Sequence, residues 1–210
     1  MSRPTVAVIG GGASGAATAF HLLGMPSAPR VVVFERNGRF ARGAAYGTTA
    51  ITHLLNVPAA NMSMTPEHPG DLLDWLRESG AAAAPTDFVP RLRYGEYLSS
   101  RLHEAAGRGP GELVLETAGV TGVHREGSRF VVQSASGDLH ADAVVLALGN
   151  FEPTAPFVPE PLPNVFENPW DPAAYEGIER ESDLLLVGSG LTAADVVVEA
   201  RARGFQGTVH

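Results

Sequence analysis

The sequence predicts an α/β fold in three layers, with a parallel sheet, an antiparallel β hairpin or meander, and the start of a second α/β unit near the C-terminal end. Three observations predict it: buried strand patterns alternate with helical patterns, two strands lead straight into glycine-rich turns, and a proline-rich stretch separates those turns. Strands that alternate with helices are typical of parallel sheets covered by those helices.

The N-terminal residues predict one βαβ unit. Residues 5–9 are a β-branched apolar run, which leads into the glycine-rich turn 10–15 and then into a helix of small residues. A second buried strand at 30–34 ends at Glu35. Strand, turn, helix and strand together span about 30 residues, which is the usual length of such a unit.

The pattern between this unit and residue 150 is more mixed. Residues 37–70 keep no sustained period, and a loop of this length inside a compact domain is usually functional or disordered. The remaining patterns predict helices at 71–79 and 94–106, strands at 113–115 and 120–123, a hairpin at 130–132 and 139–141, and a buried strand at 143–148.

A proline-rich stretch divides the chain. Seven of the twenty residues 153–172 are proline, so an extended connector without helix or central strand is expected there. After it a strand at 184–187, a glycine turn, a helix at 191–202 and the start of a strand at 207–210 repeat the opening pattern. The predicted domains are therefore 1–150, a connector at 151–181, and the start of a second unit at 182–210, as expected for an N-terminal piece of a longer protein.

Composition restricts the classes of function. The chain is 44% hydrophobic and 18% charged, with a net charge of -8 and no basic run, so it is globular and neither nucleic acid nor a membrane is an expected partner. Cysteine and lysine are absent, which excludes thiolate and Schiff-base chemistry and P-loop NTPases. The seven histidines lack metal-ligand spacing. Glycines interrupt the N-terminal apolar stretch, unlike in a signal peptide, so a cytoplasmic protein is expected.

The first glycine turn reads Gly10-x-Gly12-x-x-Gly15. In such a turn the first glycine permits the tight bend, the second lets a pyrophosphate approach the backbone, and the third lets the helix pack on the strand. The N–H groups at the start of the helix, among them those of Ala13 and Ser14, would then face the phosphates. The alternative is a plain glycine-rich turn without a ligand.

Glu35 lies twenty residues past Gly15, at the end of the next strand. A carboxylate at this place accepts hydrogen bonds from ribose hydroxyls and repels a 2′-phosphate, so the first site is expected to hold FAD or NAD and not NADP.

The second turn, Gly188-Ser189-Gly190-Leu191-Thr192-Ala193, has alanine in place of the third glycine. Two such sites suit a flavin and the nicotinamide that reduces it.

Further segments carry a resemblance to a known family: Arg42-Gly43-Ala44-Ala45-Tyr46-Gly47, the stretch from Leu55 to Ser63, Ala147-Leu148-Gly149-Asn150, and Asn168-Pro169-Trp170-Asp171. With the two glycine turns, they make the sequence resemble the two-dinucleotide-binding-domain flavoproteins, the group of flavin-dependent and N-hydroxylating monooxygenases, and in particular the bacterial FAD/NAD(P)-binding proteins. The resemblance runs over essentially the whole chain and is more specific for the superfamily than for a reaction.

The resemblance implies roles for individual residues. The FAD pyrophosphate would be held by Gly10, Gly12, Ala13, Ser14 and Gly15, the ribose by Glu35, and the adenine by Arg36 at its edge and by the backbone of Val120. Arg42 and Tyr46 would pass near the cofactor, Asn56 and Met62 would border the isoalloxazine, and Gly149 would lie where the chain leaves the flavin domain. The nicotinamide nucleotide would be held by Gly188, Gly190, Leu191 and Thr192. Two alternatives remain open: Arg42 is a solvated loop charge, and Met62 fills the core.

The expected function is an FAD-dependent oxidoreductase in which NAD(P)H reduces a bound flavin, and the flavin then reduces or oxygenates a small-molecule substrate. The resemblance suggests NADPH, although the residues that would select it should follow residue 210. No side chain is assigned a catalytic role, and the oligomeric state is left open. One alternative is a non-catalytic nucleotide-binding module. Another, an NAD dehydrogenase that uses only the first site, lacks the expected catalytic histidine or Lys/Tyr pair.

Overall fold

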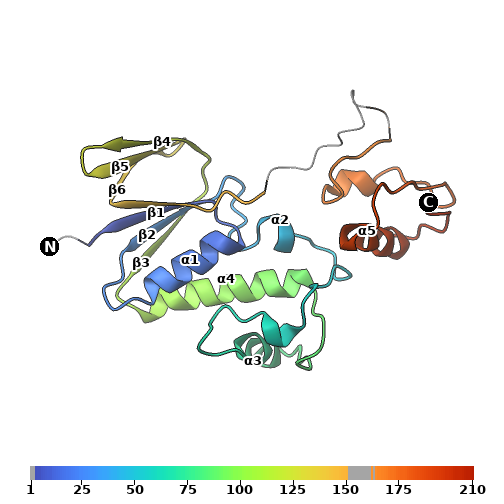
Figure 1. The fold of residues 1–210 in the computed structure, drawn as a ribbon, viewed down its shortest axis with the longest axis horizontal. Coiled ribbons are helices and arrows are strands. Elements are labelled where there is room, and N and C mark those ends of the chain that lie inside the picture. Colours follow the sequence, from blue (N-terminus) through green and yellow to red (C-terminus); the bar gives the residue numbers. More distant parts are fainter. Residues whose placement is uncertain (1–2, 151–161, 163) are drawn as a thin grey trace.

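The computed structural model describes residues 3–150, 162 and 164–210 (Figure 1). Its strands are β1 (Thr5–Ile9), β2 (Arg30–Phe34), β3 (Glu112–Glu116), β4 (Val120–Glu126), β5 (Arg129–Ser134), β6 (Gly137–Ala141) and β7 (Ala143–Leu146). Its helices are α1 (Ala13–Leu23), α2 (Gly43–Tyr46), α3 (Asp71–Glu78), α4 (Arg91–Arg108) and α5 (Leu191–Ala202), with short 3-10 turns η1 (Ala59–Asn61) and η2 (Pro172–Tyr175).

Four parallel strands form the central sheet, in the order β3-β2-β1-β7. Strands β4, β5 and β6 form a separate antiparallel sheet. Helices α1 and α4 lie side by side on one face of the parallel sheet and the antiparallel sheet lies on the other face, as Figure 1 shows. The predicted three-layer α/β fold is therefore confirmed.

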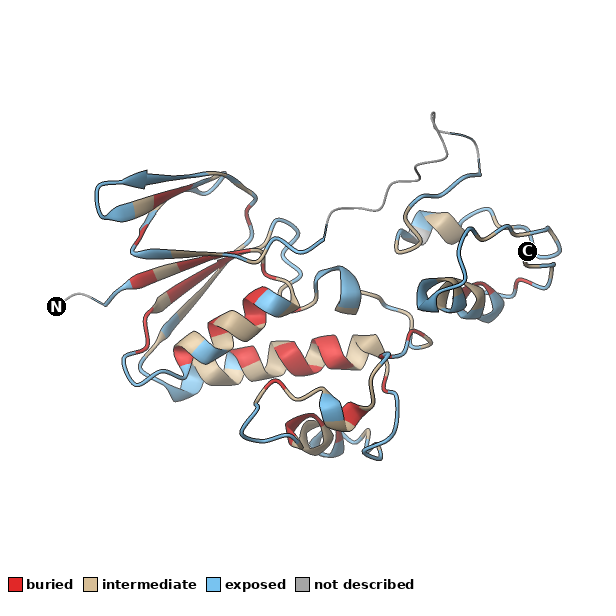
Figure 2. Ribbon diagram, in the orientation of Figure 1, coloured by how far each residue is buried: buried red, intermediate tan, exposed pale blue. Residues whose placement is uncertain are grey.

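Each face of the parallel sheet has its own core, because a strand buried on both faces points alternate side chains to opposite sides. Val8, Val31 and Val33 pack toward α1 and α4, while Ala7 and Val32 pack toward the antiparallel sheet. The buried residues in Figure 2 accordingly concentrate on the strands and on the facing sides of α1 and α4. The carboxyl ends of the strands are thus held rigidly, and the first glycine turn lies at that edge.

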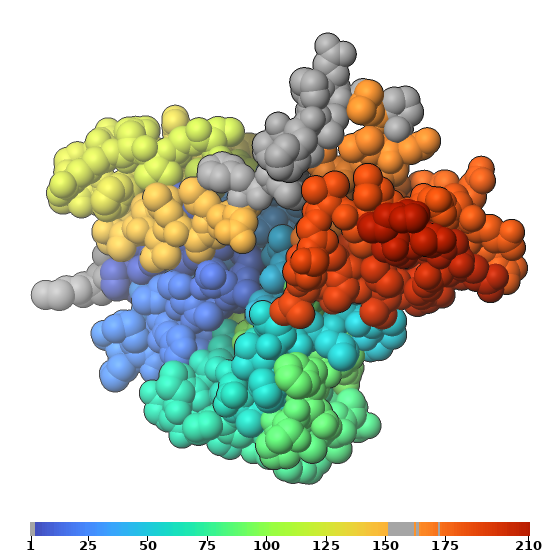
Figure 3. All heavy atoms as spheres, turned by 45° about the vertical axis from the view of Figure 1, so that its right-hand side comes forward, coloured from blue at the N-terminus to red at the C-terminus, as the bar shows by residue number. Residues whose placement is uncertain are grey.

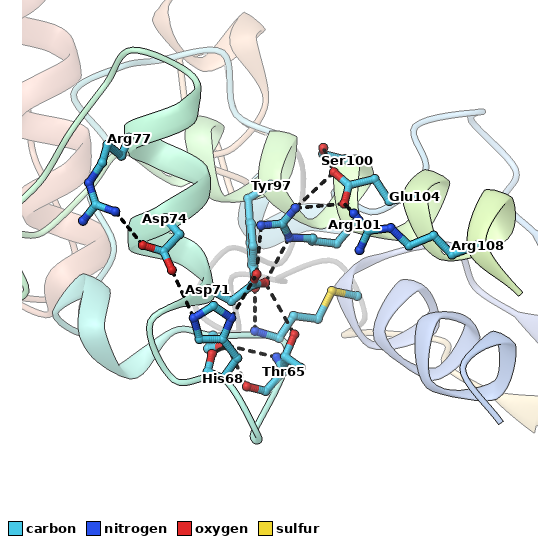
Figure 4. Close-up of polar contacts among 12 residues, drawn as sticks. Thr65, His68, Asp71, Asp74, Arg77, Tyr97, Ser100, Arg101, Glu104 and Arg108 are labelled. Atoms are coloured by element: carbon cyan, nitrogen blue, oxygen red, sulfur yellow. Dashed lines mark hydrogen bonds and ion pairs between the residues drawn. The ribbon is translucent and has the colours of Figure 1, made fainter. Parts of the chain in front are cut away.

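A buried polar network joins α3 to α4 (Figure 4). The Asp71 carboxylate accepts a hydrogen bond of 2.6 Å from the Tyr97 hydroxyl, and Arg101 Nη2 lies 2.8 Å from its other oxygen. Tyr97 also accepts a hydrogen bond from the Met64 N–H, at 2.8 Å. Burial by itself raises the pKa of Asp71, but the hydrogen bonds from Tyr97 and Arg101 outweigh it, so the pKa lies below its ordinary value. Asp71 is therefore an ionised anchor between the two helices.

The long loop at 37–70 is ordered by a second segment that runs beside it. Leu55 N–H donates to the Val89 carbonyl at 2.8 Å and Ala59 N–H donates to the Asp87 carbonyl at 2.9 Å. These bonds satisfy backbone groups that a loop inside a domain would otherwise leave unpaired. The expected loop therefore contains α2 and η1, and it is held against the body of the domain.

The C-terminal part corrects two expectations. The strands predicted at 184–187 and 207–210 are reduced to one parallel bridge between Leu184 and Val209. Leu185 and Val187 are 71% and 82% exposed, since no further strand in the described part of the chain covers them. The connector was expected to hold no helix, yet η2 begins at Pro172, because proline is tolerated in the first turn of a helix. Residues 151–161 and 163 of the connector lie outside the described residues.

Other boundaries shift by a few residues. The helix expected at 94–106 begins earlier, directly after Pro90, and β4 extends to Glu126 where an end at 123 was expected. Strand β7 ends at Leu146, two residues earlier than expected. In the described part of the chain no helix combines the length and apolarity that crossing a membrane needs.

Candidate functional site

Two glycines of the first turn are required by the protein's own packing. Gly10 has φ +104°, which side-chain-bearing residues rarely adopt, and a Cβ there would collide with the Ala147 carbonyl oxygen of the segment that follows β7. A Cβ at Gly15 would collide with the carbonyl oxygen of Gly10, so the third glycine lets α1 approach the turn. These two positions therefore have structural explanations that need no ligand.

Gly12 has no such explanation. It has φ -69°, and the nearest atom to a Cβ added there is the Gly43 Cα at 3.4 Å, an ordinary van der Waals distance. The protein thus has room for a side chain at the position where a pyrophosphate would need to approach the backbone. This space is the feature of the turn that fits a bound dinucleotide.

The N-terminus of α1 gives an electrostatic reason why an anion would fit in front of Gly12. Gly12 is its N-cap residue, no side chain caps the helix, and its first turn holds no acidic residue. The first N–H groups of a helix have no intrahelical acceptor and carry a partial positive charge. The N–H groups of Ala13 and Ser14 belong to this end, so the structure brings them together with Gly12 at a helix terminus of the kind that can bind an anion.

Glu35 follows β2 and its carboxylate is held by two backbone amides. Gly11 N–H donates to Oε2 at 3.1 Å and Asn37 N–H donates to Oε1 at 3.1 Å. A carboxylate offers about four lone-pair positions, so two acceptor positions remain. Glu35 can therefore accept from a ribose while it stays fixed beside the glycine turn.

Arg36 and Val120 lie near each other on the next edge of this region. A Cβ at Gly119 would be 3.8 Å from the Arg36 Cβ, and Val120 is the next residue, at the start of β4. Arg36 is exposed and Val120 is half-buried. The structure thus brings both predicted adenine-side residues to the Glu35 side of the turn.

The segment 41–47 lies against the glycine turn. Ala41 N–H donates to the Gly11 carbonyl at 2.7 Å, and Gly43 is the neighbour of Gly12. Arg42 is half-buried and forms no ion pair with any described residue. An unpaired guanidinium next to an anion-binding turn is suited to a phosphate. The structure places the segment that holds Arg42 against the glycine turn, and the contact of Arg42 with a cofactor stays a prediction.

Tyr46 ends α2 and packs on α4. Its ring stacks edge-to-face with Tyr94, with ring centroids 4.7 Å apart, and Gly95 lacks the Cβ that would press on the Tyr46 carbonyl. Burial raises the pKa of Tyr46, and burial together with the neighbouring Tyr46 raises the pKa of Tyr94 to about 12. Both phenols are therefore neutral at physiological pH.

The remaining predicted residues are more scattered. Asn56 is exposed, whereas Met62 is half-buried against the main core, a position that also fits the alternative of a core-filling side chain. Gly149 is exposed after β7 with φ +73°. Their predicted contacts with a flavin ring stay predictions.

The second glycine turn is open. Gly188 has φ +120°, Gly190 caps α5, and a Cβ at either glycine would meet no atom of the described residues within 4 Å. Leu191 is 62% exposed and Thr192 is exposed as well. The second turn therefore has a backbone like that of the first turn, without the enclosing segments that the first turn has.

Sequence reasoning missed a polar cluster between the C-terminal part and the first domain. Its members are Thr52, His53, Arg91, Trp170, Asp195, Glu199 and Arg203. Asp195 and Glu199 share one face of a helix that was predicted, and that spacing was the available signal. Their partners lie far away in the sequence, so the pairing itself could not be predicted. No group of three or more metal-ligating residues occurs in the described ranges.

Known structures share this fold. Over 100% of the chain, the bacillithiol disulfide reductase of Staphylococcus aureus has a TM-score of 0.69 at 15% identity, and an ornithine N-hydroxylase of Kutzneria sp. 744 has 0.70 at 15%. A flavin-containing monooxygenase of Stenotrophomonas maltophilia gives 0.53 at 21% over 88%. The chain spans 57%, 52% and 45% of those proteins, respectively. No curated protein matches the sequence.

A family model supplies the assignment that these distant structures do not. The model described as FAD-NAD(P)-binding matches residues 7–151, which contain the first glycine turn, Glu35 and the segment 41–47. The matched range begins within β1, contains strands β2 to β7, and ends just beyond β7. The chain therefore belongs to the FAD-NAD(P)-binding family.

Proposed function

We propose that the first glycine turn binds FAD and that the chain belongs to an oxidoreductase in which NAD(P)H reduces this flavin. The observation that carries the proposal is the space in front of Gly12, beside the uncapped start of α1. The protein's packing does not require a glycine there, whereas a pyrophosphate does. Glu35, fixed by two amides, supplies the acceptor for the ribose.

Each residue of the site has a distinct role in this proposal. The start of α1 binds the pyrophosphate, Arg42 neutralises part of its charge, and Glu35 orients the ribose. Arg36 and Val120 border the adenine, and Asn56 and Met62 border the ring system. Bound FAD would supply the two-electron redox chemistry, while the protein orients the reactants and excludes water.

The second turn is proposed to bind the nicotinamide nucleotide, through Gly188, Gly190, Leu191 and Thr192. Its backbone conformation and the start of α5 support this role. The ornithine N-hydroxylase of similar fold was solved with NADP+, which is in line with NADPH as the proposed reductant. The substrate is proposed to be a small molecule, reduced or oxygenated by the flavin, and the cytoplasmic location stays a prediction.

A non-catalytic FAD-binding module is the second candidate. In the part of the chain that the structure describes, the exposed Leu185, Val187 and Leu191 leave the second turn open, and a protein that holds no nicotinamide nucleotide there would bind FAD without turnover. The two candidates differ in one observable property, the reduction of bound flavin by NAD(P)H.

The first experiment is a titration of the purified chain with FAD, followed by visible absorption and tryptophan fluorescence. We expect saturable binding and a flavin band near about 450 nm that bleaches when NADPH or NADH is added without oxygen. Binding without bleaching would support the non-catalytic module, and absence of binding would contradict the proposal.

A Glu35→Ala substitution tests the assignment of the site. Loss of hydrogen bonds to a charged acceptor should weaken FAD binding by about 1–3 kcal/mol. The matched control is Glu112→Ala, since Glu112 lies at the other end of the sheet, where it pairs with Arg30 at 3.1 Å. Equal FAD affinity in the Glu35→Ala variant and the control would mean that the turn is misassigned.

A further inference from the structure

Helix α5 of the C-terminal part contacts the long loop of the first domain. Thr52 Oγ1 donates a hydrogen bond of 3.0 Å to Glu199 Oε2, and Arg91 Nη2 lies 3.1 Å from Asp195 Oδ2. Asp195 and Glu199 are one helical turn apart, so they lie on one face of α5. Figure 3 shows the C-terminal part, in orange to red, seated beside the cyan segments that hold this loop.

His53 has an unused ring nitrogen in this contact. The residue is 4% exposed, its Nδ1 lies 2.9 Å from Thr48 Oγ1, and its Nε2 has no hydrogen-bond partner among the described residues. The Nε2 lies 4.0 Å from Glu199 Oε2, just beyond hydrogen-bond length. A buried polar atom without a partner destabilises a structure, so a hydrogen bond or ion pair formed by this nitrogen would stabilise the contact.

Glu199 is the charged group that faces His53 Nε2 from α5. Glu199 is 8% exposed and its other oxygen lies 2.7 Å from Arg203 Nε. Burial raises the pKa of Glu199, but the hydrogen bonds from Arg203 and Thr52 outweigh it and hold the pKa below its ordinary value. Glu199 is therefore ionised when histidine titrates.

The other neighbours of His53 are already paired. The Trp170 ring packs edge-to-face on the imidazole, with ring centroids 5.8 Å apart, and the Arg91 guanidinium lies over the Trp170 ring at 5.5 Å from its centroid. The Asp195 carboxylate opposes the Arg91 charge, although its Oδ2 lacks hydrogen-bond geometry. The two acids of α5 are thus balanced by Arg91 and Arg203, and a proton on His53 faces Glu199 as its nearest ionic partner.

The contact joins the segment before Asn56 to the helix that follows the second glycine turn. His53 lies three residues before Asn56, which is proposed to border the flavin, and α5 begins directly after the second glycine turn. A helix is stiff because its backbone is internally hydrogen-bonded, so a contact that fixes one of its turns also fixes the residues at its start. The position of the second turn relative to the flavin segment therefore depends on this contact.

We propose that Asp195 and Glu199 are positioning residues that dock the second glycine turn onto the segment leading to Asn56, and that protonation of His53 tightens the docking through Glu199. The functional meaning of the docking rests on the proposed nucleotide site at the second turn. The docking itself does not require a cofactor, so it can be tested separately.

The test measures hydrogen exchange of residues 191–202 in the whole chain, as protection factors at pH about 5.5 and about 7.5, on either side of the ordinary histidine pKa. We expect protection to rise at least about fivefold at the lower pH, as a new ion pair across about 4 Å in a partly desolvated contact requires. His53→Gln and Glu199→Gln should each abolish this rise.

His103→Gln is the matched control, because His103 is exposed on α4 and its ring is hydrogen-bonded to the Ser99 carbonyl of the same helix, away from α5. Protection of residues 5–23 is the internal reference and should not follow the variants. A pH-independent protection of α5 in the wild-type chain, or a rise that persists in His53→Gln, would overturn the proposal.

A second readout separates the docking from the proposed function. In the FAD-loaded chain, Glu199→Gln should slow flavin reduction by NADPH and leave the FAD affinity unchanged. If the wild-type chain shows no reduction at all, the proposed function fails while the exchange data still decide the docking. If the exchange rise is lost in Glu199→Gln but reduction is not slowed, the positioning role is overturned.

Discussion

The two glycine turns have nearly the same backbone and very different surroundings. Gly10 and Gly188 have φ of +104° and +120°, and the N-cap residues Gly12 and Gly190 have φ, ψ of -69°, -166° and -78°, -175°. In both turns an uncapped helix starts directly after a short strand pattern. The local sequence therefore determines the conformation of the turn in both places.

The surroundings depend on distant parts of the chain. The first turn is enclosed by the segment after β7 and by residues 41–47, whereas a Cβ at Gly188 or Gly190 in the second turn would have no atom of residues 3–150, 162 and 164–210 within 4 Å. A turn of this kind is consequently a nucleotide site only when neighbouring strands and loops form walls around it. The comparison yields three predictions, and each changes one turn or its support and uses a matched position as control.

The largest effect is expected for Gly10→Ala compared with Gly188→Ala. At Gly10 the new Cβ collides with the Ala147 backbone carbonyl and the positive φ adds strain, so a loss of about 4 kcal/mol in unfolding free energy is expected. At Gly188 only the strain applies, which costs about 1–2 kcal/mol. Urea unfolding followed by circular dichroism measures the difference.

Equal losses in both variants would break the comparison, because they would mean that the second turn is as enclosed as the first. Hydrogen exchange adds the location of the effect. Gly10→Ala should lower the protection of β1 and α1, whereas Gly188→Ala should lower only that of α5.

A smaller effect is expected for Asp71, the buried carboxylate that anchors α3 to α4. Asp71→Asn leaves Arg101 without its buried partner and should cost about 2–3 kcal/mol at neutral pH. The pKa of Asp71 is lowered in the folded chain, so its stabilising contribution is present above the ordinary pKa of about 4 and is lost as the pH falls through the lowered value.

Unfolding free energies measured between neutral and strongly acidic pH test this sign. The wild-type chain should lose more stability than Asp71→Asn below about pH 4. The control is Asp74→Asn, because Asp74 is half-exposed on the same helix and pairs with Arg77 at the surface. A parallel acid decline in wild type and Asp71→Asn would exclude Asp71 as the titrating anchor.

The contrast between the turns also explains how far the sequence could predict this molecule. Strands β1 and β2, helix α1, the glycine turn and the position of Glu35 follow from patterns within about 30 residues, because apolar runs and glycine spacing act locally. The antiparallel sheet was predicted for the same reason. The family resemblance added Arg42 to the predicted site residues, and the structure places the next residue, Gly43, against Gly12.

The rest depends on contacts that no local pattern contains. Ala41 has φ +66° and is fully buried, a conformation forced by its bond to Gly11. The Thr52–Glu199 hydrogen bond spans 147 residues. The two strands predicted near the C-terminal end appear only as one parallel bridge: Leu184 and Leu186 do donate backbone hydrogen bonds to the segment 208–210, but the pairing covers too few residues to form strands.

The smallest and most specific effect is expected for Gly12→Ala compared with Gly190→Ala. The protein accommodates a Cβ at Gly12, so the unfolding free energy should change by less than about 0.5 kcal/mol, while the methyl group lies in the path of the pyrophosphate. We expect FAD binding, measured by fluorescence titration, to weaken about tenfold or more, which is about 1.4 kcal/mol.

Gly190→Ala should leave FAD affinity unchanged and weaken only NADPH binding. If Gly12→Ala instead lowers stability with no effect on FAD, the space in front of Gly12 is a packing feature and the first turn is no better a nucleotide site than the second. If both variants weaken FAD equally, the two turns do not hold separate nucleotides. Only selective loss of FAD binding in Gly12→Ala preserves the distinction, because it alone ties the ligand to the glycine of the first turn that the fold does not need.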